Sequence, residues 1–296
     1  MHKYLRAVGF SGINSREKLQ SIIALTIKNA KERSFTTLED DVLLAEYTLS
    51  FGPGFGLTVC GEMDKEDRFV FEYCYPFLRA DNVSSDEKVT IERHAATISY
   101  AGVFDDERMG ITIIFYLLNR IPYVMKRNTN SLPSSGTTIS LTGLSLEGTI
   151  VMPVVKNPKE EKKATERRRN RNILMEAAKK GDESAIETLT LKDMDMYSQI
   201  SRKIRYCDVY TLVETYFMPY GVECDQYSIL GEIELWREEK NSVTDEVVYE
   251  MLLNCNEMKI AVCINKADLV GEPEVGRRFK GNIWLQGYIN YPGTNV

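Results

Sequence analysis

Cysteine and histidine are the residues of this sequence from which a nucleophile and a general base could be assembled. A catalytic thiol needs an imidazole within hydrogen-bonding reach, and the candidates are Cys60 or Cys74 with His94. Each of the three falls in a segment where apolar and polar residues alternate, as they do in half-buried strands. A lone histidine in such a strand is typical of a structural residue. We therefore assign no catalytic residue and favour a protein that is not an enzyme.

A metal site would need several clustered ligands. The six cysteines are scattered along the chain without a Cys-x-x-Cys pair, and the sequence contains only two histidines. Zinc sites are built from closely spaced ligands of these types, so we expect no metal site. Four of the cysteines lie in or beside apolar strand patterns, which is typical of reduced thiols packed in a core.

Two short motifs invite a nucleotide interpretation. Asn265-Lys-Ala-Asp268 follows an apolar segment and is similar to the guanine-reading motif of GTPases, but the sequence lacks the Gly-Lys-Ser/Thr tripeptide that holds phosphates and Mg²⁺. Gly52-Pro-Gly-Phe-Gly56 opens a strand pattern, whereas a dinucleotide fingerprint opens a helix. We interpret the first motif as a polar turn and the second as a hairpin turn. We expect no cofactor, and a nucleotide-dependent enzyme remains a remote alternative.

One charge cluster could bind a polyanion. Six positively charged residues fall within a short stretch of the middle of the chain, at Lys162, Lys163, Arg167, Arg168, Arg169 and Arg171. Such a run attracts phosphates with strong salt dependence. However, neighbouring glutamates partly neutralise it, no aromatic residues are interleaved with it, and the whole chain carries a formal net charge of −6. We favour a solvated linker helix and keep nucleic-acid binding, through the basic helix 159–172 and the C-terminal sheet, as the alternative.

The elements that would position these residues change along the chain. A short strand from Tyr4 to Phe10 is followed by helical periodicity, which predicts a helix from Ser15 to Arg33 with a capping box at Asn14. From residue 42 onward, apolar residues alternate and predict an antiparallel meander. The last strands of this region are predicted at Thr137–Leu141 and Gly148–Val154.

The middle of the chain predicts four short helices. The first begins after Asn157, and the others begin at the N-caps Asp182, Thr190 and Asp208 and end before Gly221. Strands then return to the end of the chain, including a hairpin and a bent final strand from Arg278 to Tyr291. Several bent strands in a short stretch suggest a curled sheet or a partly open barrel of the oligonucleotide-binding type.

Together these patterns predict an α+β protein with an N-terminal helix plus antiparallel β-meander, a central helical connector, and a C-terminal curled antiparallel sheet or OB-like partial barrel. The expected boundaries are 1–156 for the N-terminal α+β region, 157–221 for the helical connector and 222–296 for the C-terminal β-rich region.

A resemblance covers essentially the whole chain. The segments Gly181–Glu187, Met194–Arg202, Tyr216–Ile233 and Gly271–Gly287 are similar to those of a family of uncharacterised bacterial proteins, defined only as a domain of unknown function. The resemblance implies no activity, substrate or catalytic residue.

We therefore expect a non-catalytic binding or interaction protein. The N-terminus lacks a signal-peptide pattern, and the longest apolar run, Ile111–Leu118, is too short to span a bilayer, so we expect a cytoplasmic protein without membrane contact. Its partner would be a protein or a small molecule. Aromatic and basic residues gather where the connector meets the last sheet, and they form the predicted recognition surface: Tyr220, Tyr227, Arg277, Arg278 and Trp284.

Overall fold

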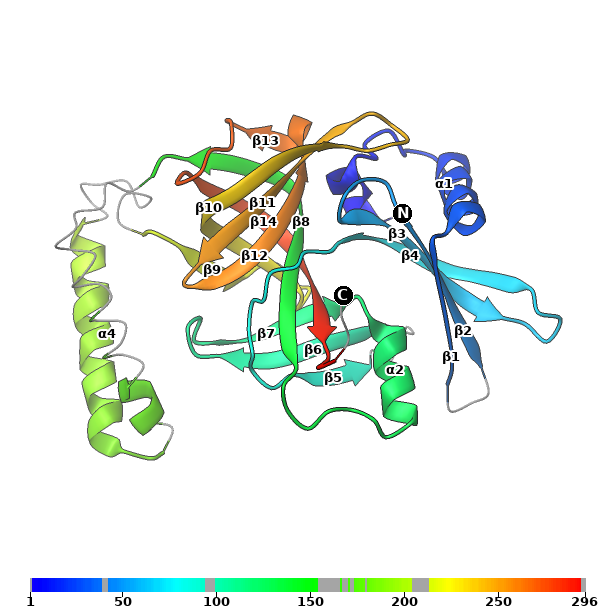
Figure 1. Ribbon diagram of the computed structural model, residues 1–296. Helices are drawn as coiled ribbons and strands as arrows, with labels where there is room; N and C mark the ends of the chain where they lie inside the picture. The colour runs from blue at the N-terminus through cyan, green and yellow to red at the C-terminus, as the bar shows by residue number, and fades with distance from the viewer. Residues whose placement is uncertain are drawn as a thin grey trace.

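The computed structural model describes residues 2–38, 42–93, 99–153, 166, 170, 173–178, 180–203 and 213–293. Within these ranges the chain forms a four-stranded antiparallel sheet and a ten-stranded mixed sheet, accompanied by a few helices (Figure 1). The predicted α+β class is confirmed. No helix in this part of the chain is both long enough and apolar enough to cross a membrane.

The N-terminal segment differs from its prediction. Residues Lys3–Val8 form a 3-10 helix, η1, rather than a strand, and Gly9 ends it with a φ of 85°. The adjacent residues Ala7 and Val8 are both buried, which a strand with one solvated face does not allow. Helix α1 (Arg16–Asn29) is confirmed but shorter than expected. Its N-cap is Ser15, whose side chain accepts from the Lys18 amide, and not Asn14.

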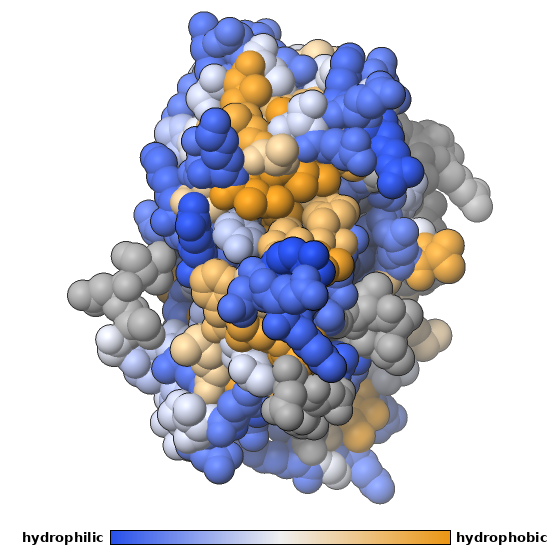
Figure 2. Space-filling model, turned by 90° about the vertical axis from the view of Figure 1, so that its right-hand side faces the viewer, coloured by the Kyte–Doolittle hydropathy of each residue, from blue (hydrophilic) through white to orange (hydrophobic). Residues whose placement is uncertain are grey.

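The four strands of the smaller sheet lie side by side in the order in which they occur in the sequence. They are β1 (Glu32–Thr37), β2 (Leu43–Ser50), β3 (Phe55–Met63) and β4 (Phe69–Leu78). The glycine-rich motif at 52–56 is the β2–β3 turn, as predicted, and Gly54 adopts a φ of 80° there. Figure 2 shows the side of the molecule on which this sheet lies, with a band of apolar residues bordered by hydrophilic ones. Three large apolar side chains of β1 and β4 are exposed, those of Phe35, Val70 and Phe71.

The next elements begin the larger sheet. They are β5 (Thr90–Arg93), β6 (Tyr100–Asp106), β7 (Ile111–Leu117), α2 (Arg120–Asn128) and β8 (Thr138–Val151). The prediction of two strands around 137–154 is wrong, because β8 is one continuous strand. Its glycines do not break it; they make room for side chains of the neighbouring strand. A Cβ at Gly148 would lie 2.4 Å from the Phe279 ring, and one at Gly143 would lie 2.8 Å from Ile283.

The connector contains one long described helix, α4 (Glu183–Lys203), which lies on the side of the molecule opposite α1 (Figure 1). Asp182 caps it as predicted, because its side chain accepts from the amides of Ser184 and Ala185. The predicted break at Thr190 is wrong. The Thr190 hydroxyl donates to the Ile186 carbonyl within the helix, as threonines inside helices do.

The remaining strands complete the larger sheet. They are β9 (Tyr216–Pro219), β10 (Gln226–Lys240), β11 (Val247–Cys255), β12 (Met258–Asn265), β13 (Leu269–Val270) and β14 (Arg278–Asn290), with a 3-10 turn η2 (Lys266–Asp268) after β12. The predicted β11–β12 hairpin is confirmed, and its turn residues Asn256 and Glu257 both have positive φ. The predicted helix from Asp208 does not reach Met218, since residues 216–219 are strand β9.

Strand β8 joins the two halves of the chain. It pairs in parallel with β12 and in antiparallel fashion with β14, so the sheet curls until β8 has partners on both sides. The predicted curl is confirmed, but the sheet is mixed rather than wholly antiparallel, because β8 pairs in parallel with β12 and β7 in parallel with β14. The whole sheet also extends through β7, β6 and β5 and is not a closed barrel. The predicted boundaries near 156 and 222 stay predictions, and the larger sheet draws strands from both sides of them.

Two apolar clusters form the core. One contains alternate residues of β8, β10, β11, β12 and β14, such as Ile139, Leu141 and Val262, and lies inside the curl. The other contains Leu57, Val59 and Phe77 of the smaller sheet together with Leu144 and Trp284 of the larger one. The second cluster therefore holds the two sheets against each other.

Candidate functional site

A row of polar side chains runs along β8 and β14 on the face opposite the curled interior. Side chains two positions apart on a strand share a face, and the β8–β14 register places three residues of each strand opposite one another. We call this set the polar ladder, and its members are Thr138, Ser140, Thr142, Gln286, Tyr288 and Asn290.

The polar ladder is tied to the end of β4. The Thr142 hydroxyl donates to the Leu78 carbonyl at 2.8 Å. The Gln286 amide donates to the Pro76 carbonyl at 2.8 Å and accepts from the Leu78 amide at 3.1 Å. These bonds satisfy backbone groups where the smaller sheet meets the larger one. They also fix the position at which the segment after β4 leaves the sheet.

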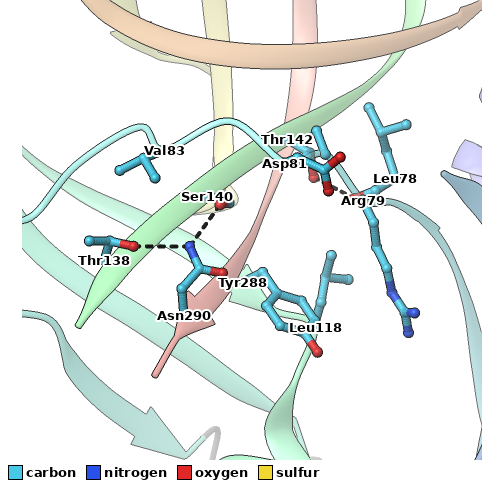
Figure 3. Close-up of a pocket in the computed structure, with 11 residues that line it drawn as sticks. Leu78, Arg79, Asp81, Val83, Leu118, Thr138, Ser140, Thr142, Tyr288 and Asn290 are labelled. Atoms are coloured by element: carbon cyan, nitrogen blue, oxygen red, sulfur yellow. Dashed lines mark hydrogen bonds between the residues drawn. The ribbon is translucent and has the colours of Figure 1, made fainter. Parts of the chain in front are cut away.

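A pocket opens beside these bonds, between the polar ladder and the segment that follows β4. Its volume is about 420 Å³, and Figure 3 shows the side chains around it. The lining residues are Leu78, Arg79, Ala80, Asp81, Val83, Leu118, Thr138, Ser140, Thr142, Tyr288 and Asn290. The walls are therefore mostly aliphatic, and the floor carries hydroxyl and amide groups.

Asn290 organises the floor of the pocket. Its Nδ2 donates to the Thr138 hydroxyl at 3.1 Å and to the Ser140 hydroxyl at 2.9 Å. Both hydroxyl oxygens therefore act as acceptors, and each keeps a proton with which it can donate to a further group. The Tyr288 ring lies next to them in the pocket wall (Figure 3). Burial raises the pKa of Tyr288, so its hydroxyl stays protonated at neutral pH.

Two charged residues lie at the rim of the pocket. The Arg79 guanidinium forms a two-pronged ion pair with Glu32, at 2.7 and 2.9 Å, and lies 4.9 Å from the centre of the Phe77 ring. It is also 5.9 Å from the centre of the Tyr288 ring. Asp81 is exposed to solvent. The rim thus offers one cation that already has a partner and one solvated carboxylate.

The cysteines predicted as catalytic candidates lie elsewhere. Cys60 on β3 and Cys74 on β4 are buried, and His94 lies outside the described residues. Burial raises the pKa of Cys60 well above its ordinary value and raises the pKa of Cys74 to about 11. Both thiols are therefore protonated and poorly nucleophilic at neutral pH. Among the described residues, no group of three His, Cys, Asp or Glu side chains is placed to hold a metal ion.

Next to Cys60 the structure contains a buried ion pair that the sequence analysis missed. Arg120, the first residue of α2, donates to Glu46 on β2 and, at 2.5 Å, to the Tyr73 hydroxyl. The Arg120 side chain is 1% exposed and that of Glu46 is 8% exposed. In the sequence, the one sign of this ion pair is Glu46, a charged residue within the alternating pattern of β2.

The structure separates the five residues predicted as a recognition surface into two groups. The aromatic residues Tyr220, Tyr227 and Trp284 lie around the start of β10, whereas Arg277 and Arg278 lie at the start of β14. Tyr227 is buried, its ring stacks on Phe217 at 4.4 Å, and its hydroxyl accepts from the Ile114 amide at 2.8 Å. Tyr220, by contrast, is 46% exposed. Arg277 forms a local ion pair with Glu274 at 2.5 Å.

Arg278 is buried and binds backbone carbonyl groups. Its guanidinium donates to the Met152 carbonyl at 2.8 and 3.1 Å and to the Val213 carbonyl at 2.8 Å. Met152 precedes the predicted connector and Val213 lies near its C-terminal end, so Arg278 ties the two ends of this region to β14. Trp284 is buried in β14, and its indole N–H donates to Asp225 at 2.8 Å.

Of the two remaining motifs, the GTPase-like one has a structural role, and the basic run lies outside the described part of the chain. Asp268 of the GTPase-like motif is bound by Arg6, at 2.5 and 2.7 Å, and the strand before it is one arm of a hairpin, as predicted. The six positively charged residues proposed for nucleic-acid binding, between Lys162 and Arg171, lie outside the described residues.

The pocket residues were not predicted. One signal for them exists in the sequence, the run Thr138-Ile-Ser-Leu-Thr142, in which hydroxyl residues alternate with apolar ones. It predicts a strand with one polar face, but it does not indicate that this face is partly covered by another segment.

Comparison with known families gives one match. The family model described as "Domain of unknown function, E. rectale Gene description (DUF3881)" matches residues 5–287. The chain belongs to the DUF3881 family. The DUF3881 match contains the β8 side of the polar ladder and ends one residue before Tyr288. Neither the curated proteins nor the solved structures contain a match to the chain.

Proposed function

We propose that this protein is a non-catalytic binding protein whose pocket beside the polar ladder takes a small polar molecule. The observation that carries the proposal is the floor of the pocket, where Asn290, Thr138 and Ser140 form one hydrogen-bonded unit. Small-molecule sites are commonly concave and mostly apolar, with a few convergent polar groups, and have volumes of roughly 300–1,000 Å³. The volume of about 420 Å³ falls in that range.

The chemistry of the lining favours a neutral ligand with hydroxyl or amide groups. Hydroxyl and amide side chains both donate and accept hydrogen bonds, so they pair with groups of the same kind. The Tyr288 ring supplies an aromatic wall against which a flat or ring-shaped molecule can pack. Arg79 is already paired with Glu32, and this weakens the case for an anionic ligand. A sugar, a nucleoside or a small amide fits these properties.

The proposed compartment is the cytoplasm. The cysteines among the described residues, Cys60, Cys74, Cys224, Cys255 and Cys263, are free thiols. Free thiols are the common state in reducing compartments, whereas secreted proteins tend to pair them.

The proposal is tested by screening neutral sugars, nucleosides and amides for thermal stabilisation and then measuring the affinity of any hit by calorimetry. A ligand that binds only the folded chain raises the melting temperature. Tyr288→Phe, which removes one hydroxyl, and Asn290→Ala, which removes the organising amide, are expected to weaken binding by about five-fold or more, as losing a hydrogen bond of about 1 kcal/mol would.

Tyr220→Phe is the matched control, because it removes a tyrosine hydroxyl from the exposed surface predicted from the sequence. Its affinity is expected to equal that of the unaltered chain. If Tyr220→Phe weakened binding while Tyr288→Phe did not, the ligand would bind at the sequence-predicted surface, and the pocket assignment would be wrong.

A further inference from the structure

A second hollow lies between η1 and the turn that precedes β10. Its volume is about 420 Å³, and it shares no lining residue with the pocket described above. The residues around it are His2, Lys3, Tyr4, Glu223, Asp225 and Trp284. Trp284 is the one member of the sequence-predicted surface that lines it.

One wall of the hollow is aromatic. The Tyr4 and Trp284 rings stack with their centres 5.4 Å apart and an angle of 23° between their planes. The His2 ring lies 4.6 Å from Trp284, and Tyr116 lies 5.1 Å from it. Burial lowers the pKa of His2 to about 4, so this imidazole is neutral at physiological pH and belongs to the uncharged wall.

The other side of the hollow is acidic. Asp225 accepts from the Trp284 indole at 2.8 Å, which fixes the orientation of that ring. Glu223 accepts from the side chain of Gln226, which holds the second carboxylate beside the same rings. Both carboxylates act on Tyr4: burial raises the pKa of its hydroxyl, and Glu223 and Asp225 raise it further. The hollow therefore places negative charge beside the Tyr4 and Trp284 rings, which are themselves largely buried, and the Tyr4 ring is the one that Lys3 already contacts.

A cation already occupies part of this environment. The Lys3 ammonium lies 5.1 Å from the centre of the Tyr4 ring. This distance is within the range of about 6 Å in which a cation is attracted to a ring face. Lys3 is exposed to solvent, so its long side chain can leave the ring without disturbing the core.

We propose that this hollow is a binding site for a small organic ammonium ion and that Lys3 competes for it from within the chain. Aromatic faces bind ammonium groups through the ring quadrupole, and quaternary ammonium ligands are commonly recognised by such aromatic walls. The two carboxylates favour a positive charge at the same point. The ligand differs in charge from the neutral molecule proposed for the pocket beside the polar ladder.

Trp284 provides the readout. The chain contains two tryptophans, and Trp236 lies on β10 away from the hollow, so a Trp236→Phe background leaves Trp284 as the reporter. Choline chloride is titrated at constant ionic strength, and the fluorescence of Trp284 is expected to change in a saturable way. The neutral isostere 3,3-dimethyl-1-butanol is titrated in parallel and is expected to give no saturable change.

The variants assign the roles of the charged residues. Lys3→Ala removes the internal competitor and is expected to tighten choline binding about three-fold, while Glu223→Gln and Asp225→Asn each weaken it by about three-fold or more. Both acidic replacements keep a hydrogen-bond acceptor for their existing partner. Lys28→Ala and Glu183→Gln, at exposed positions on α1 and α4, are the matched controls and are expected to change nothing.

The outcomes are distinct. A saturable response to choline that is tightened by Lys3→Ala and weakened by Glu223→Gln supports the site. No saturable response in the Lys3→Ala variant overturns the proposal, because the hollow then does not bind the ion. An equal response to the neutral isostere also overturns it, because binding then does not require positive charge. Near-ultraviolet circular dichroism of each variant confirms that the aromatic cluster is intact.

Discussion

Arg120 and Glu46 form an ion pair in the interior of the molecule, between α2 and the smaller sheet. A buried pair gains little over a well-packed apolar pair, but removing one partner leaves an uncompensated charge out of water. The Tyr73 hydroxyl and the Cys60 thiol lie in the same cluster, so a single substitution disturbs all of them.

We therefore expect Arg120→Met to lower the free energy of unfolding by about 3–5 kcal/mol. The double variant Glu46→Gln with Arg120→Met should cost less than Arg120→Met alone, because no charge remains buried. Urea unfolding measures both. Arg68→Met, at a pair whose arginine side chain is 70% exposed, should cost less than about 1 kcal/mol. A double variant less stable than Arg120→Met would contradict this account.

Glu250 provides a prediction about pH. It is buried on β11 opposite Arg237, and burial raises its pKa to about 7 although Arg237, at 2.5 Å, opposes the shift. Because the folded chain holds this proton more tightly than the unfolded chain, the stability contributed by Glu250 is present below the ordinary glutamate pKa and is lost as the pH rises toward 7.

The stability of the unaltered chain relative to Glu250→Gln should therefore fall by about 3 kcal/mol between pH 4.5 and pH 8, at about 1.4 kcal/mol for each pKa unit. Urea unfolding of both chains across this range gives the difference directly. A relative stability that increased with pH would show that the ion pair with Arg237 outweighs burial.

For single residues, the sequence predicted the local conformation of motifs better than it predicted which side chains are exposed. Sequence reasoning correctly interpreted the motif ending at Asp268 as a turn and the glycines at 52–56 as a hairpin. It placed Tyr227 and Arg278 on a binding surface, although both are buried, because an aromatic or basic residue near a turn has the same local pattern whether it faces solvent or the core. The pocket was missed because Tyr288 and Asn290 become a site only through pairing with β8.

Among the elements, the base of the connector depends on Arg278. Its guanidinium binds one carbonyl just before the connector and one near the connector's C-terminal end. We expect Arg278→Met to remove the hydrogen bonds to these carbonyls and to cost about 1–3 kcal/mol. Cleavage within residues 153–213 in limited proteolysis should become faster by more than the loss of global stability explains. Arg277→Met is the matched control, since its ion pair is at the surface and should contribute less than about 1 kcal/mol.

Strand β8 shows why element boundaries were only partly predictable. Glycines normally weaken or bend strands, and because of those at 143 and 148 two short strands were predicted. They are instead places where Ile283 and Phe279 approach the backbone, a requirement set by a strand far away in the sequence. The same limit applies to Thr190, whose capping signal is overridden by the continuing helix.

The basic run between Lys162 and Arg171 stays a prediction at this scale. If it binds nucleic acid, the chain should be retained on single-stranded DNA at low salt, and retention should weaken steeply as salt rises. Replacing the six positively charged residues by glutamine should then abolish it. Equal elution of both chains would leave the solvated-linker interpretation in place.

For the whole molecule, the larger sheet contains strands from both halves of the chain, so we expect the chain to fold as one cooperative unit. A fragment of residues 1–156 contains β8 but neither β12 nor β14, which pair with it on its two sides. We expect this fragment to show no cooperative thermal transition by circular dichroism, and we expect mixing with the fragment 157–296 to restore one. A sharp transition in the isolated fragment would show that the first half folds on its own.

The pairing of β8 also affects how the protein is made. Asn290 is bonded to Thr138, 152 positions earlier in the chain, so β8 leaves the ribosome long before the strand that covers it has been translated. An unpaired strand is prone to join other chains in that interval. The alternating hydroxyls of Thr138, Ser140 and Thr142 make one face of this stretch polar, so we expect the residues that later form the floor of the pocket to reduce such association during synthesis.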